Sequence, residues 1–142
     1  MSLTEPLPTT ITVPILTLAR PLAGLEWITT LAITPIGGEN SGFVALNPPD
    51  DEEITLVAAN PELVCPGYDA VIDELDAELL EATGPDDLIA FVLCTLGDTP
   101  EQATVNLLAP VVVNWRTLRC AQVVLHGEPY SVRAPLGTPV KL

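Results

Sequence analysis

The chain has 142 residues and carries 19 acidic residues against five basic ones, which gives a formal net charge of −14. This length predicts a single domain, and the shortage of Lys and Arg excludes the basic footprint that direct nucleic-acid binding requires. Hydrophobic residues make up 48% of the chain but aromatic residues only 4%, so we expect an aliphatic core.

The first half of the chain reads as short strands separated by turns. The chain holds fifteen prolines and nine glycines, which favours an all-β domain over a helical bundle. Residues 1–10 are expected to be a mobile leader, residues 35–42 a turn-rich loop and residues 47–53 an acidic, solvated loop. Strands are expected at residues 11–18, 26–33, 43–46 and 54–58. In the second of these, Trp27, Thr29, Leu31 and Ile33 would share one face.

Residues 68–82 fit two patterns at once. Residues 68–72 alternate as a strand would, whereas three apolar residues further on recur at helical spacing. We therefore expect a strand over residues 68–72, followed by a helix over residues 74–82 that ends before Gly84. The apolar face of this helix would consist of Leu75, Leu79 and Ala82.

Four carboxylates gather around the start of this expected helix: Asp69, Asp73, Glu74 and Asp76. Asp73 is the expected N-cap, because its side-chain oxygen can accept a free backbone N–H of the first turn. Negative charge in the first turn is favoured by the helix dipole. The cluster has two interpretations: an ordinary capped and solvated helix start, or a contact surface for a basic protein.

Residues 103–114 form a stretch that is apolar almost throughout, with Thr104, Asn106 and Asn114 as its polar residues. Its three consecutive valines favour a strand, and Pro110 predicts an edge or a bulge, since it cannot donate to a ladder. An unpaired Asn106 amide would be costly in apolar surroundings. We expect its side chain to hydrogen-bond a neighbouring backbone group and lock the bend; the bend could also present Asn106, Leu107 and Leu108 to a partner.

The remaining strands are expected at residues 87–96, 121–125 and 130–133, followed by a loose tail over residues 135–142. The whole chain, residues 1–142, is thus interpreted as one domain of about eight to nine short strands and one short helix. Closure removes exposed sheet edges. The predicted fold class is therefore all-β, a small antiparallel β-barrel.

No motif for catalysis, metal binding or cofactor binding is present. The one histidine, His126, belongs to a turn and is interpreted as solvated. Cys65, Cys94 and Cys120 are widely spaced and include no C-x-x-C pair. The chain lacks a secretory signal pattern and an apolar run of about 18 residues. These features predict a cytoplasmic, non-enzymatic protein without cofactors or membrane contact.

Three segments together resemble the FliW family of flagellar assembly factors. They are ITLVAANP at residues 54–61, followed by Tyr68, then LIAFVLCTL at residues 88–96, and TVNLLAPVVVN at residues 104–114. The resemblance runs from about residue 18 to residue 136. Members of the family are small, acidic, cytoplasmic β-barrel proteins, so the resemblance implies a barrel whose function is to bind other proteins.

The resemblance implies two partners. One is CsrA, a small basic mRNA-binding protein whose repression of flagellin translation the family relieves; the other is flagellin, which competes with CsrA. A basic partner would be attracted to a chain with a charge of −14. The candidate partner-binding residues are Asp69, Asp73, Glu74 and Asp76, chosen for their charge, and Asn106, Leu107, Leu108 and Pro110, which match the family's most recognisable motif.

The chain departs from the family pattern in two places. Residues 23–27 replace a Gly-hydrophobic-Pro-Gly-Phe-like segment, and residues 47–53 replace a Leu-Gln-Ser-like segment. The second departure supports an alternative function: a β-barrel assembly module that binds a flagellar protein without regulating CsrA. In either case the sequence is interpreted as that of a monomer.

Overall fold

The computed structural model describes residues 13–37, 41–51, 53–65, 67–99, 102–125 and 130–135. These residues form nine strands, namely β1 (Ile15–Leu18), β2 (Thr30–Ile36), β3 (Phe43–Asn47), β4 (Leu56–Ala59), β5 (Leu88–Thr95), β6 (Thr104–Val105), β7 (Val111–Asn114), β8 (Arg119–Gln122) and β9 (Ala134–Pro135). They also form two short helices, α1 (Pro61–Val64) and α2 (Glu74–Leu79), and a 3-10 turn, η1 (Pro85–Asp87). Within the described part, no helix is long and apolar enough to cross a membrane.

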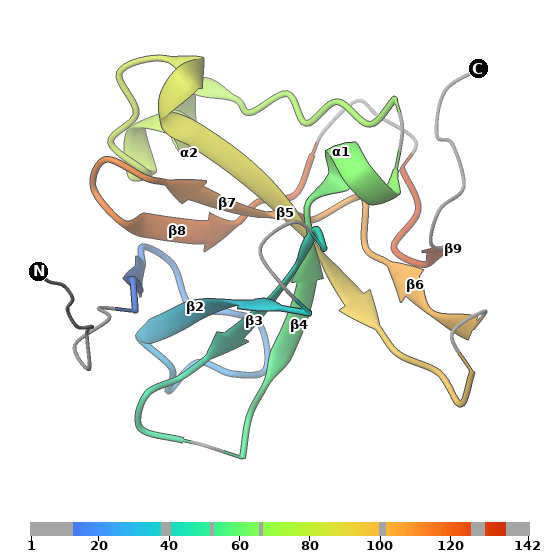
Figure 1. Cartoon of the computed structure of the whole chain (residues 1–142). Helices are drawn as coiled ribbons and strands as arrows, with labels where there is room; N and C mark the ends of the chain where they lie inside the picture. Colours follow the sequence, from blue (N-terminus) through green and yellow to red (C-terminus); the bar gives the residue numbers. More distant parts are fainter. Residues whose placement is uncertain are drawn as a thin grey trace, which may run out of the picture.

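The strands close into a barrel (Figure 1). Around the ring the order is β4, β3, β2, β1, β8, β7 and β5, and the pairing of β4 with β5 closes it. β6 and β9 extend the sheet beyond β5. β1 and β8 run parallel, which the antiparallel prediction did not include, while the other strand pairs are antiparallel. The predicted small all-β barrel is confirmed.

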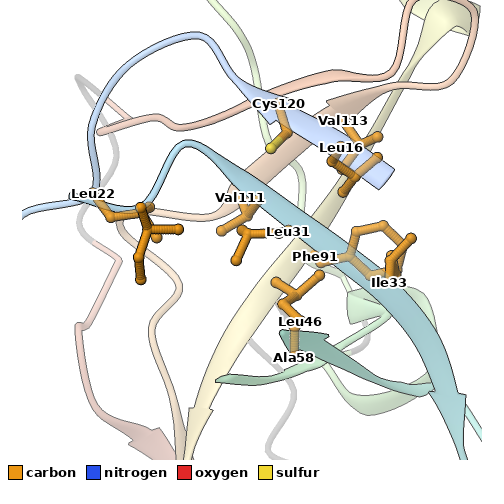
Figure 2. Close-up of a cluster of buried hydrophobic side chains, with 11 residues drawn as sticks. Leu16, Leu22, Leu31, Ile33, Leu46, Ala58, Phe91, Val111, Val113 and Cys120 are labelled. Atoms are coloured by element: carbon orange, nitrogen blue, oxygen red, sulfur yellow. The ribbon is translucent and has the colours of Figure 1, made fainter. Parts of the chain in front are cut away.

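The barrel interior is aliphatic, as composition predicted. Figure 2 shows side chains from most of the ring strands meeting in the centre, with Leu31, Leu46 and Val111 among them. Each of these three is fully buried. Phe91 is the aromatic member of this cluster, and Trp115 packs edge-on against its ring with a centroid distance of 6.4 Å.

Strand β7 is buried on both faces. Val111 and Val113 point into the barrel, whereas Val112 belongs to a second cluster on the outside. That outer cluster contains Leu80, the residue that follows α2, and it is packed against residues 68–72. Because a barrel strand ordinarily exposes one face, the outer face of β7 requires a cover, and α2 with the segment before it supplies one.

The bend predicted around Asn106 and Pro110 separates β6 from β7. The Asn106 Oδ1 atom accepts hydrogen bonds from the backbone N–H groups of Leu108, at 3.1 Å, and Ala109, at 3.0 Å. The Asn106 N–H itself donates to the Leu93 carbonyl at 2.9 Å, so the chain leaves β5 at this residue. The predicted locking role of Asn106 is therefore confirmed.

Neighbouring segments satisfy the backbone of this bend. Val123 N–H donates to the Pro110 carbonyl at 2.9 Å, and Leu125 N–H donates to the Leu108 carbonyl at 2.8 Å. Residues 123–125, predicted as the end of a strand, thus follow the bend rather than the sheet ladder.

Strand β8 is shifted relative to its prediction at residues 121–125. It begins at Arg119, since a turn after β7 ends at Leu118 with φ of 61°. The last strand is also shifted, because β9 replaces the strand predicted at residues 130–133. Pro135, predicted as part of the tail, pairs with Thr104. The rest of that tail and the leader over residues 1–10 lie outside the described residues.

The strand predicted at residues 26–33 was wrong in its first half. β2 occupies the second half and continues into the segment predicted as a loop. Residues 22–28 instead form turns closed by backbone hydrogen bonds of 3.0 Å. Trp27 consequently points outward and is 64% exposed, instead of sharing the buried face of Leu31 and Ile33.

The predictions for residues 68–82 were partly wrong. Residues 68–72 are irregular, and α2 is shorter than the helix predicted over residues 74–82. Glu81 has φ of 59°, a left-handed conformation that cannot continue a helix. A one-turn helix, α1, follows β4. The Asn60 side chain caps it by accepting a hydrogen bond from Glu62 N–H at 3.0 Å.

Replacing Asn106 by alanine is expected to lower the free energy of unfolding by about 1–2 kcal/mol, since two half-buried N–H groups lose their acceptor. Denaturation in urea measures this difference. The matched control is Asn106→Asp, which keeps the accepting oxygen and should retain most of the stability. Equal losses in both variants would show that the bend does not depend on this oxygen.

Candidate protein-binding surface

The irregular segment before α2 is held by two tyrosines rather than by a strand ladder. The Tyr68 hydroxyl donates to the Leu107 carbonyl at 2.7 Å. The Tyr130 hydroxyl donates to the Asp69 carbonyl and accepts from the Asp69 N–H, both at 3.2 Å. The two rings lie 4.8 Å apart. Sequence alternation resembled a strand here because the extended segment covers the outer cluster with every second side chain.

These contacts bring the two predicted groups of partner-binding residues together. Tyr68 precedes the acidic Asp69 and bonds to Leu107 in the bend. Leu107 and Pro110 are buried, however, while Asn106 and Leu108 keep part of their surface exposed. The buried pair shapes the bend, and the surface of the bend comes from the other two.

The helix start follows the sequence prediction. The Asp73 Oδ1 atom accepts the backbone N–H of Asp76 at 2.8 Å, so Asp73 is the N-cap. Glu74 is exposed in the first turn, and Asp69 and Asp73 are exposed as well. We call these three exposed carboxylates the acidic rim.

Asp76 differs from its neighbours because it is turned inward. It is 8% exposed, and its carboxylate forms an ion pair with Arg20 at 2.8 Å. Arg20 lies in the turn after β1, far away in the sequence. Of the four predicted carboxylates, Asp76 is therefore the one already neutralised within the chain.

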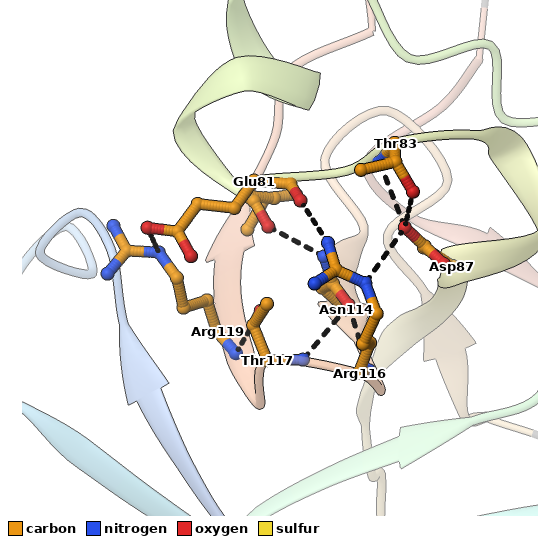
Figure 3. A network of polar contacts seen from close by, with 8 residues as sticks. Glu81, Thr83, Asp87, Asn114, Arg116, Thr117 and Arg119 are labelled. Carbon is orange, nitrogen blue, oxygen red and sulfur yellow. Dashed lines mark hydrogen bonds and ion pairs between the residues drawn. The ribbon is translucent and has the colours of Figure 1, made fainter.

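Two more arginines are engaged near the end of α2 (Figure 3). Arg116 lies 3.4 Å from the Asp87 carboxylate and donates to the Glu81 carbonyl at 2.7 Å. Arg119 lies 3.7 Å from the Glu81 carboxylate and donates to the Leu79 carbonyl at 3.2 Å. Positive charge at a helix C-terminus is favourable, so both arginines stabilise α2.

This pairing leaves the acidic rim without internal neutralisation. Within the described residues, the ion pairs are those of Arg20, Arg116 and Arg119, and none involves a rim carboxylate. The rim therefore presents uncompensated negative charge to solvent, where it can attract a positively charged molecule.

An apolar groove lies beside the acidic rim. Its volume is about 680 Å³; residues 70–72 and α2 form its walls, and Leu88, Ala90 and Val112 contribute to its floor. Glu74, a rim residue, also lines it. Val71, which lines the groove, is 65% exposed, and Leu75, which follows Glu74 in α2, is 77% exposed.

Leu75 was predicted on the buried face of the helix, and this was wrong. Leu80 is the fully buried residue instead, because the chain leaves the helix there and turns toward β7. The sequence pattern predicted a helix over residues 74–82, whereas α2 ends at Leu79. Leu75 is consequently free to contact another molecule.

Asn114 holds this region to the barrel, a role that sequence analysis missed. Its side chain is fully buried; it donates to the Leu80 carbonyl at 2.8 Å and accepts from the Arg116 N–H at 2.9 Å. A buried amide at the end of an apolar run, just before a turn, was the available signal. The Leu80 contact could not be predicted, since it joins residues far apart in the chain.

No group of three or more metal-ligating side chains occurs among the described residues, and His126 lies outside them. Burial raises the pKa of the Cys94 thiol to about 11 and that of Cys120 to about 12. These thiols are protonated at neutral pH, which makes them poor nucleophiles.

Asp87, the last residue of η1, belongs to the network of polar contacts in Figure 3. Its ionisation also affects the stability of the protein at low pH. Hydrogen bonds from the Thr83 backbone and hydroxyl, both 2.9 Å long, and then the Arg116 charge hold the Asp87 pKa below its usual 3.8. A lowered folded-state pKa means that the charged form stabilises the fold. This contribution is complete above pH 3.8 and is lost as the pH falls through the folded-state pKa.

Asp87→Asn is expected to lower the urea midpoint at pH 7, and the difference from the unaltered protein should shrink as the pH falls below 3.8. Urea denaturation at pH 7 and at a series of acidic pH values measures it. Asp86→Asn, an exposed neighbour, is the control and should have little effect. A difference that stays constant across this range would contradict the assignment.

Comparison with known proteins identifies the family. The family model described as FliW protein matches residues 8–136. The flagellar assembly factor FliW of Bacillus licheniformis is 34% identical over 116 residues, which cover 82% of this chain and 80% of the relative. The corresponding protein of Clostridioides difficile is 29% identical, over 85% of this chain and 92% of the relative.

A solved structure supports the fold independently. The crystal structure of a flagellar assembly factor FliW superposes with a TM-score of 0.80, covering 91% of this chain and 89% of the other at 23% identity. The barrel fold is therefore shared with that structure. Together with the matching family model and the relatives, this shows that the chain belongs to the FliW family.

Proposed function

We propose that this protein is a cytoplasmic flagellar assembly factor that acts by binding other proteins, as a monomer and without catalysing a reaction. The relatives that carry this name support the first part. The exposed acidic rim beside an apolar groove supports the second, and it is the observation on which the proposal rests.

The first proposed partner is CsrA, the basic mRNA-binding regulator that the family resemblance implies. The charge of −14 attracts a basic protein, and the rim offers Asp69, Asp73 and Glu74 on one surface. Such charges increase the rate of encounter more than they increase final affinity. By occupying CsrA, the protein would relieve repression of flagellin translation without touching RNA itself.

The second proposed partner is flagellin. The groove floor and the exposed Val71 and Leu75 provide apolar area that an apolar segment of flagellin could bury. Leu108, partly exposed on the bend, is assigned a supporting contact. Asn106, Leu107 and Pro110 are assigned the role of fixing the bend.

The rim and the groove overlap, and this explains how the two partners would compete. Glu74 belongs to the rim and also lines the groove. A protein seated in the groove would cover that carboxylate, so the two sites cannot be filled independently. Accumulated flagellin would in this way release CsrA.

Removing two rim charges, in the variant Asp69→Asn/Glu74→Gln, should weaken CsrA binding about threefold to tenfold, and the loss should shrink at high salt. Calorimetric titration with CsrA at two salt concentrations measures this effect. Asp73 is left unchanged, because it caps α2.

The matched control is Glu53→Gln/Asp98→Asn, which removes the same charge from exposed residues in the β3–β4 and β5–β6 connections, away from α2 (Figure 1). An equal loss of CsrA binding in the control would show that CsrA is attracted by the overall negative charge of the protein and not by the rim. If the unaltered protein bound flagellin but not CsrA, the alternative assembly module would be correct. Binding of neither partner would overturn the proposal.

Val71→Ser/Leu75→Ser should weaken flagellin binding about tenfold or more, since two apolar side chains would no longer be buried in the complex. Both are exposed in the free protein, so the melting temperature should hardly change. Leu96→Ser is the control: Leu96 is 66% exposed and follows β5 at the other end of that strand. Unchanged flagellin binding by the double variant would show that flagellin does not bind at the groove.

A further inference from the structure

A second surface lies around Trp27, in the connection between β1 and β2. The indole is 64% exposed, whereas the chain's other tryptophan, Trp115, packs against Phe91. Large aromatic side chains are enriched where proteins bind other molecules. Nothing in the function proposed above uses this residue.

Trp27 forms one wall of a small cavity of about 150 Å³. The β3–β4 connection also contributes to the lining, with Pro48, Pro49, Asp50 and Asp51. Ile28 and Pro48 are buried, so the base of the cavity is anchored in the core. Asp51 N–H donates to the Pro48 carbonyl at 3.2 Å, which closes the turn that carries the two carboxylates.

The cavity combines an aromatic face with negative charge. Asp50 is exposed, and none of the ion pairs in the described residues involves Asp50 or Asp51. One carboxylate oxygen of Asp51 accepts the Glu53 N–H at 3.2 Å, which fixes the direction of this side chain. Both carboxylates therefore line the cavity, and neither has an ion-pair partner among the described residues.

We propose that this cavity binds the guanidinium group of an arginine side chain from a basic segment of another protein. A guanidinium plane stacks on an indole face, and its edge donates paired hydrogen bonds to a carboxylate. Trp27 and Asp50, which both line the cavity, would supply these two partners. An ammonium group has no plane to stack, so lysine should bind more weakly.

The size of the cavity favours one side chain over a larger ligand. Pockets for cofactors and drug-sized molecules have volumes of roughly 300–1,000 Å³, well above the 150 Å³ measured here. The β3–β4 connection, which contributes half of the residues that line the cavity, lies away from α2 (Figure 1). The cavity is thus an additional contact, independent of the rim and the groove.

The two tryptophans make a direct test possible. In a ¹H–¹⁵N spectrum the Trp27 indole N–H reports on the cavity, while that of Trp115 serves as an internal control. Titration with Nα-acetylarginine amide should shift the Trp27 signal in a saturable way. The corresponding lysine derivative should need a higher concentration, and the glutamine derivative should shift it little, all at equal chloride concentration.

Variants separate the cavity from general attraction to an acidic protein. Asp50→Asn should weaken arginine binding about threefold to tenfold, with the Trp27 signal as the readout. Asp98→Asn removes an equal charge elsewhere and should leave binding unchanged. Trp27→Leu, followed through the backbone signals of the β3–β4 connection, should show a similar loss and keep a dispersed spectrum, because its side chain is mostly exposed.

Three results would overturn the proposal: equal shifts of both indole signals, an equal loss of binding in Asp98→Asn and Asp50→Asn, or an equal response to the glutamine derivative. None of these depends on CsrA or flagellin. The cavity and the function proposed for α2 can therefore fail separately.

Discussion

The double-sided burial of β7 is the constraint on which the rest of the structure depends. Val111 and Val113 fill the barrel, and Val112 must be covered from outside. That cover is α2 with residues 68–72, held by tyrosine hydroxyls and by the Asn114 side chain rather than by a strand ladder. A cover built this way leaves a groove along its edge, so the packing that buries the valine also creates the candidate surface.

Charge is distributed to suit this arrangement. Three arginines are engaged around α2, two of them at the carbonyls of its last turn and beyond. They stabilise a helix that is too short to be stable by itself. Because few cations are available in so acidic a chain, three of the four carboxylates at the helix start have no ion-pair partner among the described residues; Asp76 is paired with Arg20. The shortage of Lys and Arg therefore accounts for the exposed negative charge at the start of α2, since the three arginines are engaged elsewhere around the helix.

Much of the fold could be predicted from local chemistry. Asp73 caps α2 and Asn106 locks the bend through groups within three residues of each, and such contacts are visible in a sequence. Errors arose where periodicity was ambiguous: residues 68–72 alternate without pairing, and residues 26–29 alternate but form turns. Leu75 was assigned to the apolar face of a longer helix. The helix ends before that face is complete, because Glu81 adopts a left-handed conformation.

The sequence by itself determined the class of fold, the acidity, the absence of recognisable catalytic motifs and the family resemblance. Only the tertiary structure decided which of four adjacent carboxylates are available, since Asp76 is neutralised by Arg20, a residue 56 positions away. It likewise brought Trp27 and Asp50, from two separate connections, into the lining of one cavity. The physical reason is the same in both cases: hydrogen bonds within a turn depend on a few neighbouring residues, whereas ion pairs and cavities depend on how distant segments pack.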